Sequence, residues 1–368
     1  MRLRFRRGEA FQIANSTARC GENFKTICSI FGLKLVALRS GKGAFEFKKI
    51  GMTKVKAKPF LKWAGGKGQL LPQFEDFYPK ELRGRRVEKY VEPFVGGGAV
   101  FFEVAQRHGI KTAYLSDVNK DLVLTYWAVQ QKPDDLLDFL QQYQKEYDLT
   151  SPEKRTELFL AMRSHFNQQR FEINYKKWSD NWMPRAAQLI FLNKTCFNGL
   201  FRLNSKGEFN VPFGKYPNPS ILDERNIRAA SAVLQMAEIR IANYEQSFDE
   251  ITSNSFVYLD PPYRPISSTA SFTTYSGSGF TDNDQRKLAA FFRKIDVEKQ
   301  ARLMLSNSDP KNENPNDDFF EKTYSGYYLN RVSASRSINC NGEKRGAIRE
   351  LVITNYHLWQ PSLTIPLS

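Results

Sequence analysis

The chain has 368 residues, of which 25% are charged and 14% are aromatic, and this composition excludes a disordered or fibrous protein. Its 54 Lys and Arg against 39 Asp and Glu give a net charge of +15, which favours a polyanionic partner such as nucleic acid. Residues 1–51 hold eleven Lys or Arg and three Glu, so about half of this excess lies in the first 51 residues.

Metal sites, disulfides and membrane spans are not expected. The cysteines Cys20, Cys28, Cys196 and Cys340 form no Cys-x-x-Cys pair, and the three histidines share no ligand spacing. This cysteine usage fits the reducing cytoplasm. No apolar run approaches the roughly 20 residues that a membrane span needs.

Residues 1–57 differ from the rest of the chain. They are basic, show no convincing hydrophobic period, and end near Met52, where the sequence resembles a natural protein start. We therefore interpret them as a basic N-terminal extension that is not part of the working protein, with Met52 as the working start. The alternative is a small basic arm that contacts DNA.

From residue 58 onward, strand and helix signals alternate. Residues 89–92 predict a strand, which a glycine loop and a helix over 99–107 follow, and residues 113–117 predict the next strand, before a helix over 120–130. This strand–loop–helix–strand order indicates a parallel α/β unit.

Residues 126–245 change in character and read as an insertion. They are rich in aromatic, Asn, Gln and basic residues, with helices expected near 136–147 and 155–167 and a loop-rich stretch over 194–219. Strands at 240–242 and 256–259, a helix over 282–295 and strands at 303–306 and 348–354 complete the pattern. The fold class is therefore α/β, a Rossmann-like sheet with a mainly helical insertion. The sheet domain is expected to be discontinuous, over 58–125 and 246–357, and residues 358–368 form a tail.

Asp260-Pro261-Pro262-Tyr263 follows the apolar strand at 256–259 and is the most informative motif. The two prolines force a turn at the carboxyl end of this strand, which is the edge where open α/β sheets bind ligands. A carboxylate, a proline carbonyl and an aromatic face suit a planar ring that carries an exocyclic amine. A plain strand followed by a proline turn is the alternative.

The glycine loop Phe94-Val95-Gly96-Gly97-Gly98 lies between a strand and a helix, where backbone approaches a ligand closely. Asp117 follows at the end of the next strand, where its carboxylate can accept ribose hydroxyl hydrogen bonds. Phe101 replaces the third glycine of a dinucleotide fingerprint, and this favours an adenosyl ligand without phosphates over a nicotinamide dinucleotide.

A third cluster, from Lys62 to Lys67, contains Trp63 and two glycines but is not a P-loop, because Gly68 replaces the Ser or Thr that would hold magnesium. Trp63 is a candidate to cover an adenosyl ring, and Lys67 to bind an amino-acid carboxylate. Taken alone, such a cluster is more often a basic surface turn.

These clusters occur in the order seen in Dam-type DNA adenine N6-methyltransferases of the D12 class, alpha group, and the chain resembles that family over residues 58–357. Residues 191–202 and 207–214 resemble the family's target-recognition segment. The resemblance also includes Ser268–Tyr275 and Arg336–Ile338. Residues 126–245 are therefore expected to form the DNA target-recognition domain of a bacterial-type, nucleoid-associated enzyme.

The resemblance implies S-adenosylmethionine as methyl donor, double-stranded DNA as partner and no metal. The expected catalytic residues are Asp260, Pro261, Pro262 and Tyr263. The expected cofactor-binding residues are Trp63, Lys67, Phe94, Gly96, Gly98, Asp117 and Asp260. The expected DNA-binding residues are Lys62, Phe197, Asn198, Arg202 and Pro212.

In the expected mechanism, the target adenine rotates out of the duplex, and Asp260 and the Pro261 carbonyl hold its amino group for direct methyl transfer. Phe272 and Tyr275 are candidates to cover the flipped base or to pack a lid. The likeness of the recognition segment implies GATC as the site, with a related site or a non-catalytic DNA-binding module as alternatives. Restriction protection, alongside a cognate endonuclease that shares the site, and housekeeping DNA marking both stay open.

Overall fold

The computed structural model describes residues 26–30, 33–39, 45–49, 55–175, 178–264, 280–335 and 347–358. The chain forms two compact units, Met1–Val55 and Lys56–Ser368. The first unit contains the strands β1 (Thr26–Ile30), β2 (Leu33–Arg39) and β3 (Phe45–Lys49) in an antiparallel sheet in that order. The sequence analysis did not predict these strands, although the alternation Phe45-Glu46-Phe47 is a strand signal.

The second unit is built on a seven-stranded sheet with the order β6-β5-β4-β7-β8-β10-β9. The first five of these strands are parallel, and β10 runs antiparallel to both β8 and β9. This mostly parallel sheet confirms the predicted α/β class. The strands are β4 (Lys89–Glu92), β5 (Thr112–Asp117), β6 (Ala237–Ile241), β7 (Ser255–Leu259), β8 (Arg302–Ser308), β9 (Tyr328–Ser335) and β10 (Ala347–Thr354).

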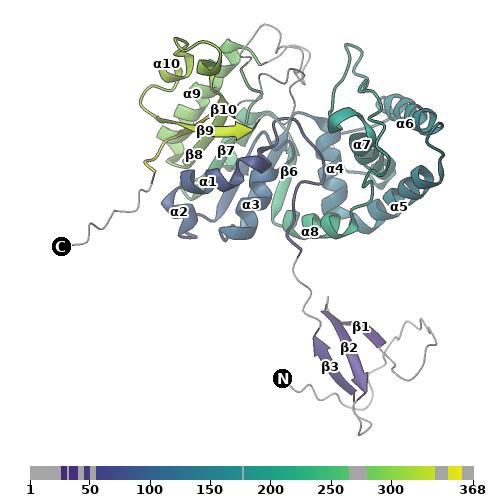
Figure 1. The fold of residues 1–368 in the computed structure, drawn as a ribbon. Helices are drawn as coiled ribbons and strands as arrows, with labels where there is room; N and C mark the ends of the chain where they lie inside the picture. Colours follow the sequence, from purple (N-terminus) through teal and green to yellow (C-terminus); the bar gives the residue numbers. More distant parts are fainter. Residues whose placement is uncertain are drawn as a thin grey trace. The chain divides into compact units, whose positions relative to one another are not determined.

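Helices cover both faces of this sheet (Figure 1). They are α1 (Leu71–Phe77), α2 (Lys80–Arg83), α3 (Ala99–Arg107), α4 (Lys120–Gln131), α5 (Pro133–Leu149), α6 (Arg155–Gln169), α7 (Met183–Thr195), α8 (Glu224–Leu234), α9 (Asp282–Lys299) and α10 (Phe319–Thr323). The sequence analysis predicted α3, α4, α5, α6 and α9 close to these bounds and missed α1, α2, α7, α8 and α10. It also missed β9.

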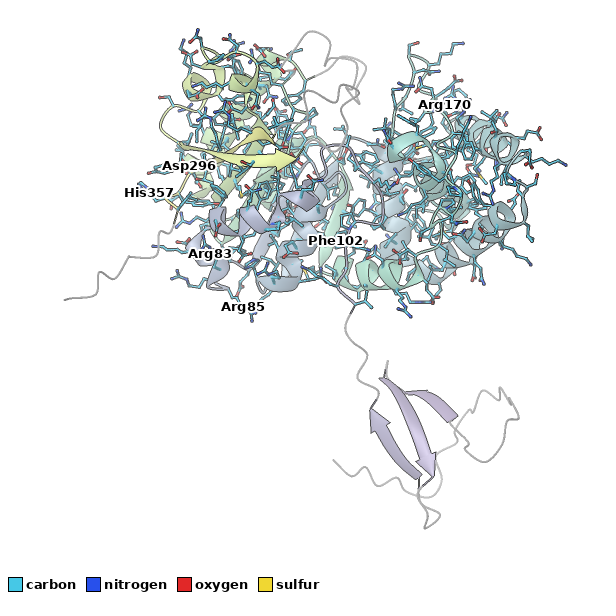
Figure 2. All side chains as sticks on the ribbon, viewed as in Figure 1. Arg83, Arg85, Phe102, Arg170, Asp296 and His357 are labelled. Atoms are coloured by element: carbon cyan, nitrogen blue, oxygen red, sulfur yellow. The ribbon has the colours of Figure 1, made fainter. Side chains whose placement is uncertain are left out.

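The alternation of side chains along the central strand β7 explains why both faces are covered. Phe256 and Tyr258 pack into the core cluster that includes α1, α3 and the insertion, whereas Val257 and Leu259 pack into the cluster that includes α9. A parallel strand that is buried on both faces reads as a continuous apolar run, and this is the signal that predicted β7. Figure 2 shows Phe102 of α3 within the molecule and Arg85 at its surface.

The helices that follow α4 and precede β6 pack as a layer beside α4, at the β6 side of the sheet (Figure 1). Helix α7 lies in its centre and contacts α4, α5 and α6. A buried ion pair ties it to the sheet domain, because Asp121 of α4 accepts hydrogen bonds from Arg185 of α7, at 2.6 and 2.9 Å. No helix among the described residues is long and apolar enough to cross a membrane.

Candidate active site and nucleic-acid interface

Three strands bring the predicted site residues to one edge of the sheet. The parallel register pairs Glu92 of β4 with Leu115 of β5, and Val91 of β4 with Val257 of β7. The chain leaves all three strands at the same edge, so the glycine loop after β4 lies between Asp117 at the end of β5 and Asp260 after β7. This is the edge at which open α/β sheets bind ligands.

Asp117 holds the glycine loop in place. Its Oδ2 accepts a hydrogen bond from the Gly96 amide at 3.1 Å, and its Oδ1 accepts one from the Asn119 amide at 2.9 Å. Burial raises the pKa of the Asp117 carboxyl above its ordinary value, and these amide bonds oppose the rise. Gly98 has a φ of +68°, and a Cβ there would lie 2.6 Å from the Tyr126 hydroxyl oxygen, so the loop requires glycine at this position.

Asp260 is paired on both of its oxygens. Lys67 Nζ donates to Oδ2 at 2.7 Å, and Ser306 Oγ of β8 donates to Oδ1 at 3.0 Å. The Tyr258 hydroxyl lies 2.6 Å from Ser306 Oγ. Burial raises the pKa of the Asp260 carboxyl, whereas the Lys67 ammonium lowers it. The sequence analysis placed Lys67 at a cofactor carboxylate and did not anticipate its pairing with Asp260.

Tyr263 is oriented by one group at its hydroxyl and by another over its ring. Its hydroxyl donates to Glu350 Oε2 of β10 at 2.6 Å, and Lys67 Nζ lies 4.7 Å from the ring centroid. Among the described residues, none donates a hydrogen bond to the Pro261 carbonyl, whereas the next carbonyl, that of Pro262, accepts one from Gln285 Nε2 at 3.1 Å. The Pro261 carbonyl therefore keeps its acceptor capacity for a ligand.

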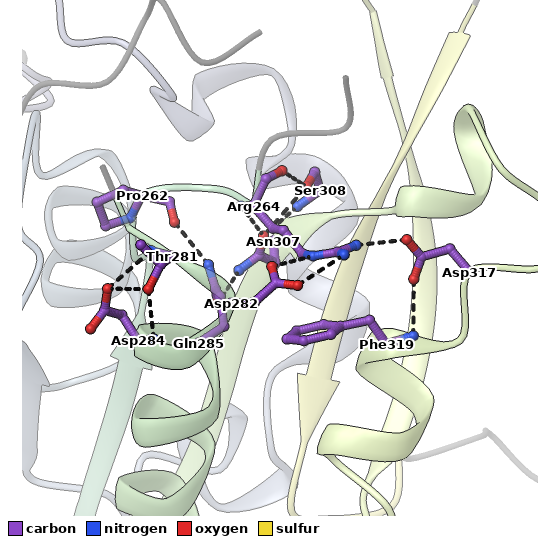
Figure 3. A network of polar contacts seen from close by, with 10 residues as sticks. All are labelled: Pro262, Arg264, Thr281, Asp282, Asp284, Gln285, Asn307, Ser308, Asp317 and Phe319. Carbon is purple, nitrogen blue, oxygen red and sulfur yellow. Dashed lines mark hydrogen bonds and ion pairs between the residues drawn. The ribbon is translucent and has the colours of Figure 1, made fainter. Parts of the chain in front are cut away.

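A polar network behind the motif fixes the chain that leaves it (Figure 3). Gln285 of α9 lies between Pro262 and Asn307, whose Nδ2 donates to Gln285 Oε1 at 3.1 Å. The Arg264 amide donates to Asn307 Oδ1 at 3.1 Å, and its guanidinium binds Asp282 and Asp317. Because Gln285 and Asn307 are fully buried, these bonds hold the proline turn rigidly.

Trp63 lies between the glycine loop and the insertion. A Cβ on Gly96 would come within 3.0 Å of its ring, and a Cβ on Gly97 within 3.3 Å of its Cβ. Its ring also stacks on that of Phe201, at a centroid distance of 5.4 Å. The ring of Phe94, in the same loop, stacks instead on Tyr244. The aromatic residues of the expected cofactor site therefore also join the loop to its surroundings.

The structure brings four of the five expected DNA-binding residues together. A Cβ on Gly199 would lie 2.5 Å from Lys62 Cδ, so the stem of Lys62 covers the turn that contains Phe197 and Asn198. The Phe197 amide donates to the Pro212 carbonyl at 2.9 Å. Phe197 is 51% exposed, a large exposed area for an apolar ring.

Arg202 lies in a hairpin that continues from this turn. Its Nε donates to Asn210 Oδ1 at 2.7 Å, and Leu203 and Phe209 form an antiparallel bridge beyond it. Arg170, at the insertion end of the molecule in Figure 2, supports the hairpin through an ion pair with Glu208. The Arg202 guanidinium is exposed, and both of its bonds, to the side chain and to the carbonyl of Asn210, are made within the hairpin.

Two residues beside the expected site residues escaped the sequence analysis. Tyr216 belongs to no motif, yet its hydroxyl oxygen accepts a hydrogen bond from the Asn198 amide at 3.0 Å, and Lys62 Nζ lies 5.4 Å from its ring centroid. Val118, next to Asp117, is 65% exposed. Their signals, an isolated tyrosine and an exposed valine, have no distinctive spacing. Phe272 and Tyr275, with the segments Ser268–Tyr275 and Arg336–Ile338, lie outside the described residues.

Comparison with known proteins agrees with this arrangement. Three relatives are 34–46% identical over most of their length. A "Type II methyltransferase M.MjaIII" from Methanocaldococcus jannaschii is 46% identical over 303 residues, covering 82% of this chain and 100% of the relative. A "Type II methyltransferase M1.LlaDCHI" from Lactococcus lactis subsp. cremoris is 34% identical, with 82% and 97% covered. A "DNA adenine methylase" from Vibrio cholerae is also 34% identical, with 81% and 95% covered.

The family match spans six of the seven strands of the sheet, all but β10, together with the glycine loop, the insertion and the proline motif. Residues 63–338 match the family described as "D12 class N6 adenine-specific DNA methyltransferase". Three quarters of the chain are covered, and the resemblance that the sequence analysis stated is confirmed. The chain belongs to the D12 class of N6 adenine-specific DNA methyltransferases.

Proposed function

We propose that this methyltransferase transfers a methyl group from S-adenosylmethionine to adenine N6 within GATC in duplex DNA. The observation that carries the proposal is the convergence of the glycine loop, Asp117 and the proline motif on one edge of the sheet. A donor site and an acceptor site on the same edge allow direct transfer without a covalent enzyme intermediate.

The donor set at this edge fits an adenosyl ligand. Backbone amides bind both Asp117 oxygens, and the lone-pair capacity that remains on the carboxylate suits ribose hydroxyls. The exposed Val118 beside it offers an apolar surface to an adenine ring. When bound, S-adenosylmethionine supplies a methyl group on a positively charged sulfur. The residues we assign to it are Trp63, Lys67, Phe94, Gly96, Gly98, Asp117 and Asp260.

Asp260 and the Pro261 carbonyl are assigned to the amino group of the adenine. Accepting its two hydrogens draws the nitrogen lone pair out of conjugation with the ring, which makes the nitrogen a better nucleophile. Pro262 completes the turn that aims these two acceptors. Tyr263 is assigned to stack on the ring, and its bond to Glu350 fixes the plane in which it stacks. The gain in rate comes from orientation and from groups that need no rearrangement.

Lys62, Phe197, Asn198, Arg202 and Pro212 are assigned to DNA. The target adenine lies inside the duplex, so it rotates out of the stack, and the exposed Phe197 is placed to fill the gap. Arg202 is assigned to a bidentate contact with a guanine in the major groove, a contact worth about 1–3 kcal/mol of discrimination. A phosphate contact by Arg202 would instead lower affinity for all sequences equally.

Two biological roles are compatible with GATC methylation. Two of the relatives above are named type II methyltransferases, and one is named a DNA adenine methylase. We therefore propose restriction protection, with an endonuclease that shares the site, as the first role, and DNA marking as the second. In both roles the enzyme acts in the cytoplasm, where the DNA of a bacterial-type cell lies.

The test uses plasmid DNA with the full chain and labelled S-adenosylmethionine. Mapping of N6-methyladenine by sequencing is expected to place the modified base in GATC. Asp260→Ala is expected to abolish incorporation of the label. Labelling of another adenine site would refute GATC while leaving the donor intact. Full labelling by Asp260→Ala would refute the role of the carboxylate, and absence of labelling by the unchanged chain would refute the donor.

A further inference from the structure

Three side-chain amides hold the start of the second unit in place. Between Ala57 and Lys67 the chain forms no strand. Three side chains nevertheless each bond both the amide and the carbonyl of one residue in this stretch. Gln106 bonds Ala57 at 2.8 and 2.9 Å, and Asn226 bonds Lys58 at 3.0 Å in both directions. Asn193 bonds Lys62 at 2.8 Å in both directions.

Asn193 differs from the other two in what else it holds. Its Nδ2 also donates to the Gly199 carbonyl at 2.8 Å, in the turn that carries Phe197 and Asn198. Asn193 is only 2% exposed and lies in the last turn of α7. Its oxygen and both of its amide hydrogens are in use, so only one orientation of the side chain satisfies all three bonds.

The three bonds join two segments that are far apart in the chain and adjacent in space. The Lys62 stem lies against Gly199, where any Cβ would lie within 2.5 Å of it, and Lys62 Nζ lies near the Tyr216 ring. The same segment continues to Lys67, which binds Asp260. The position of the turn of Phe197 and Asn198 is thereby set relative to Lys67, which pairs with Asp260.

We propose that Asn193 is a positioning residue for sequence discrimination, because it fixes Lys62 against the turn of Phe197 and Asn198. It touches no DNA itself. This inference rests on the proposed DNA contacts of Lys62, Phe197 and Asn198. Without Asn193, the two segments lose their common anchor, and Lys62 and the turn contact DNA independently. The loss therefore affects the preference for the correct site more than methyl transfer itself.

The experiment compares Asn193→Ala with Asn226→Ala in the full chain. The two asparagines have the same burial and make the same pair of bonds to a lysine backbone in the same segment. Among the described residues, the Asn226 side chain bonds only Lys58 and does not reach the turn of Phe197 and Asn198. The readout is the ratio of kcat/KM on the duplex that the unchanged chain methylates best to kcat/KM on duplexes with one substituted base pair. Melting temperatures and the Kd of S-adenosylmethionine are measured in parallel.

Asn193→Ala is expected to lower the discrimination ratio at least tenfold. Asn226→Ala is expected to lower the melting temperature as much as Asn193→Ala does, but to leave the discrimination ratio within twofold of the unchanged chain. An unchanged ratio for Asn193→Ala, or equal losses in both variants, would overturn the inference. If Asn193→Ala does not fold, Asn193→Asp replaces it, since it keeps the bond from the Lys62 amide and loses both donated bonds, with the same ratios expected. The preferred duplex is found with the unchanged chain, so an error in the proposed site would show itself there and not in the variants.

Discussion

The ion pair between Lys67 and Asp260 makes a specific prediction for Lys67→Met. The two side chains are 4% and 19% exposed, and Nζ and Oδ2 are 2.7 Å apart. Removing one partner of such a pair leaves an uncompensated buried charge, which costs about 3–5 kcal/mol of unfolding free energy. Methionine matches the length of the lysine stem, so the loss measures the charge and its hydrogen bonds and not a cavity.

The sign of the pH dependence follows from the Asp260 pKa. Burial raises this pKa in the folded protein, so the folded state holds a proton over a range in which the unfolded state has lost it, and stability falls as pH rises through that range. Lys67 lowers the pKa, and its removal raises the pKa further. The stability deficit of Lys67→Met is therefore expected to grow as pH rises through this range and to be smallest below it.

The same shift is expected in catalysis, because the role proposed for Asp260 requires the ionised carboxylate to accept the amino hydrogens. The acid limb of the kcat/KM profile should move to higher pH in Lys67→Met and stay in place in Lys67→Arg, which keeps the charge. Lys89→Met is the matched control, because it removes an ion pair with Glu250 at the opposite end of β4. Methyl incorporation into duplex DNA and urea unfolding, each across pH, provide the measurements. An acid limb that coincides with that of the unchanged chain would refute the control of Asp260 by Lys67.

Three further predictions concern single side chains. Arg202→Ala is expected to relax the preference at one base pair by about 1–3 kcal/mol, measured as kcat/KM on singly substituted duplexes, whereas an equal loss on all duplexes would indicate a phosphate contact. Tyr263→Phe keeps the ring and loses the bond to Glu350, so the melting temperature should fall while most DNA methylation remains. Tyr263→Ala should also lose the proposed stacking on the adenine, worth about 1–3 kcal/mol, and similar kcat/KM losses in both variants would contradict this division. Glu92→Gln should raise the melting temperature at alkaline pH but not at acidic pH, because burial raises the pKa of Glu92 well above its ordinary value and ionisation then costs stability; a melting temperature that differs equally at both pH values would contradict this reasoning.

The sequence predicted the sheet elements well where one physical signal was sufficient. The apolar run at 256–259 and the two prolines after it identified the end of β7, and the glycines after residue 92 identified the loop that follows β4. Helix α8 was missed although Asp223 caps it and its apolar residues recur at helical spacing, because no element was assigned between the loop-rich stretch that ends at residue 219 and the strand at 240–242. Its sequence carried a usable signal that the composition of its neighbours concealed.

The contacts that complete the site had no such signal. Lys67 and Asp260 are 193 positions apart, and nothing in the spacing of either motif indicates that they form a pair. The same holds for Asn193 and Lys62, which are 131 positions apart. A buried asparagine in a predicted helix reads as an ordinary polar residue, and its role depends on backbone groups, which carry no sequence identity. Contacts of this kind follow from the fold and not from a motif.

The position of Trp63 shows why the glycine loop and the hairpin that contains Arg202 are best understood as one structure. One residue packs against Gly96 and Gly97, and its ring also stacks on Phe201, which precedes the proposed guanine contact Arg202. A change at Phe201 therefore reaches the glycine loop through a single aromatic ring. Sequence recognition and cofactor binding are expected to respond together to substitutions at Phe201, and independently to substitutions in the exposed part of the hairpin, such as Lys206.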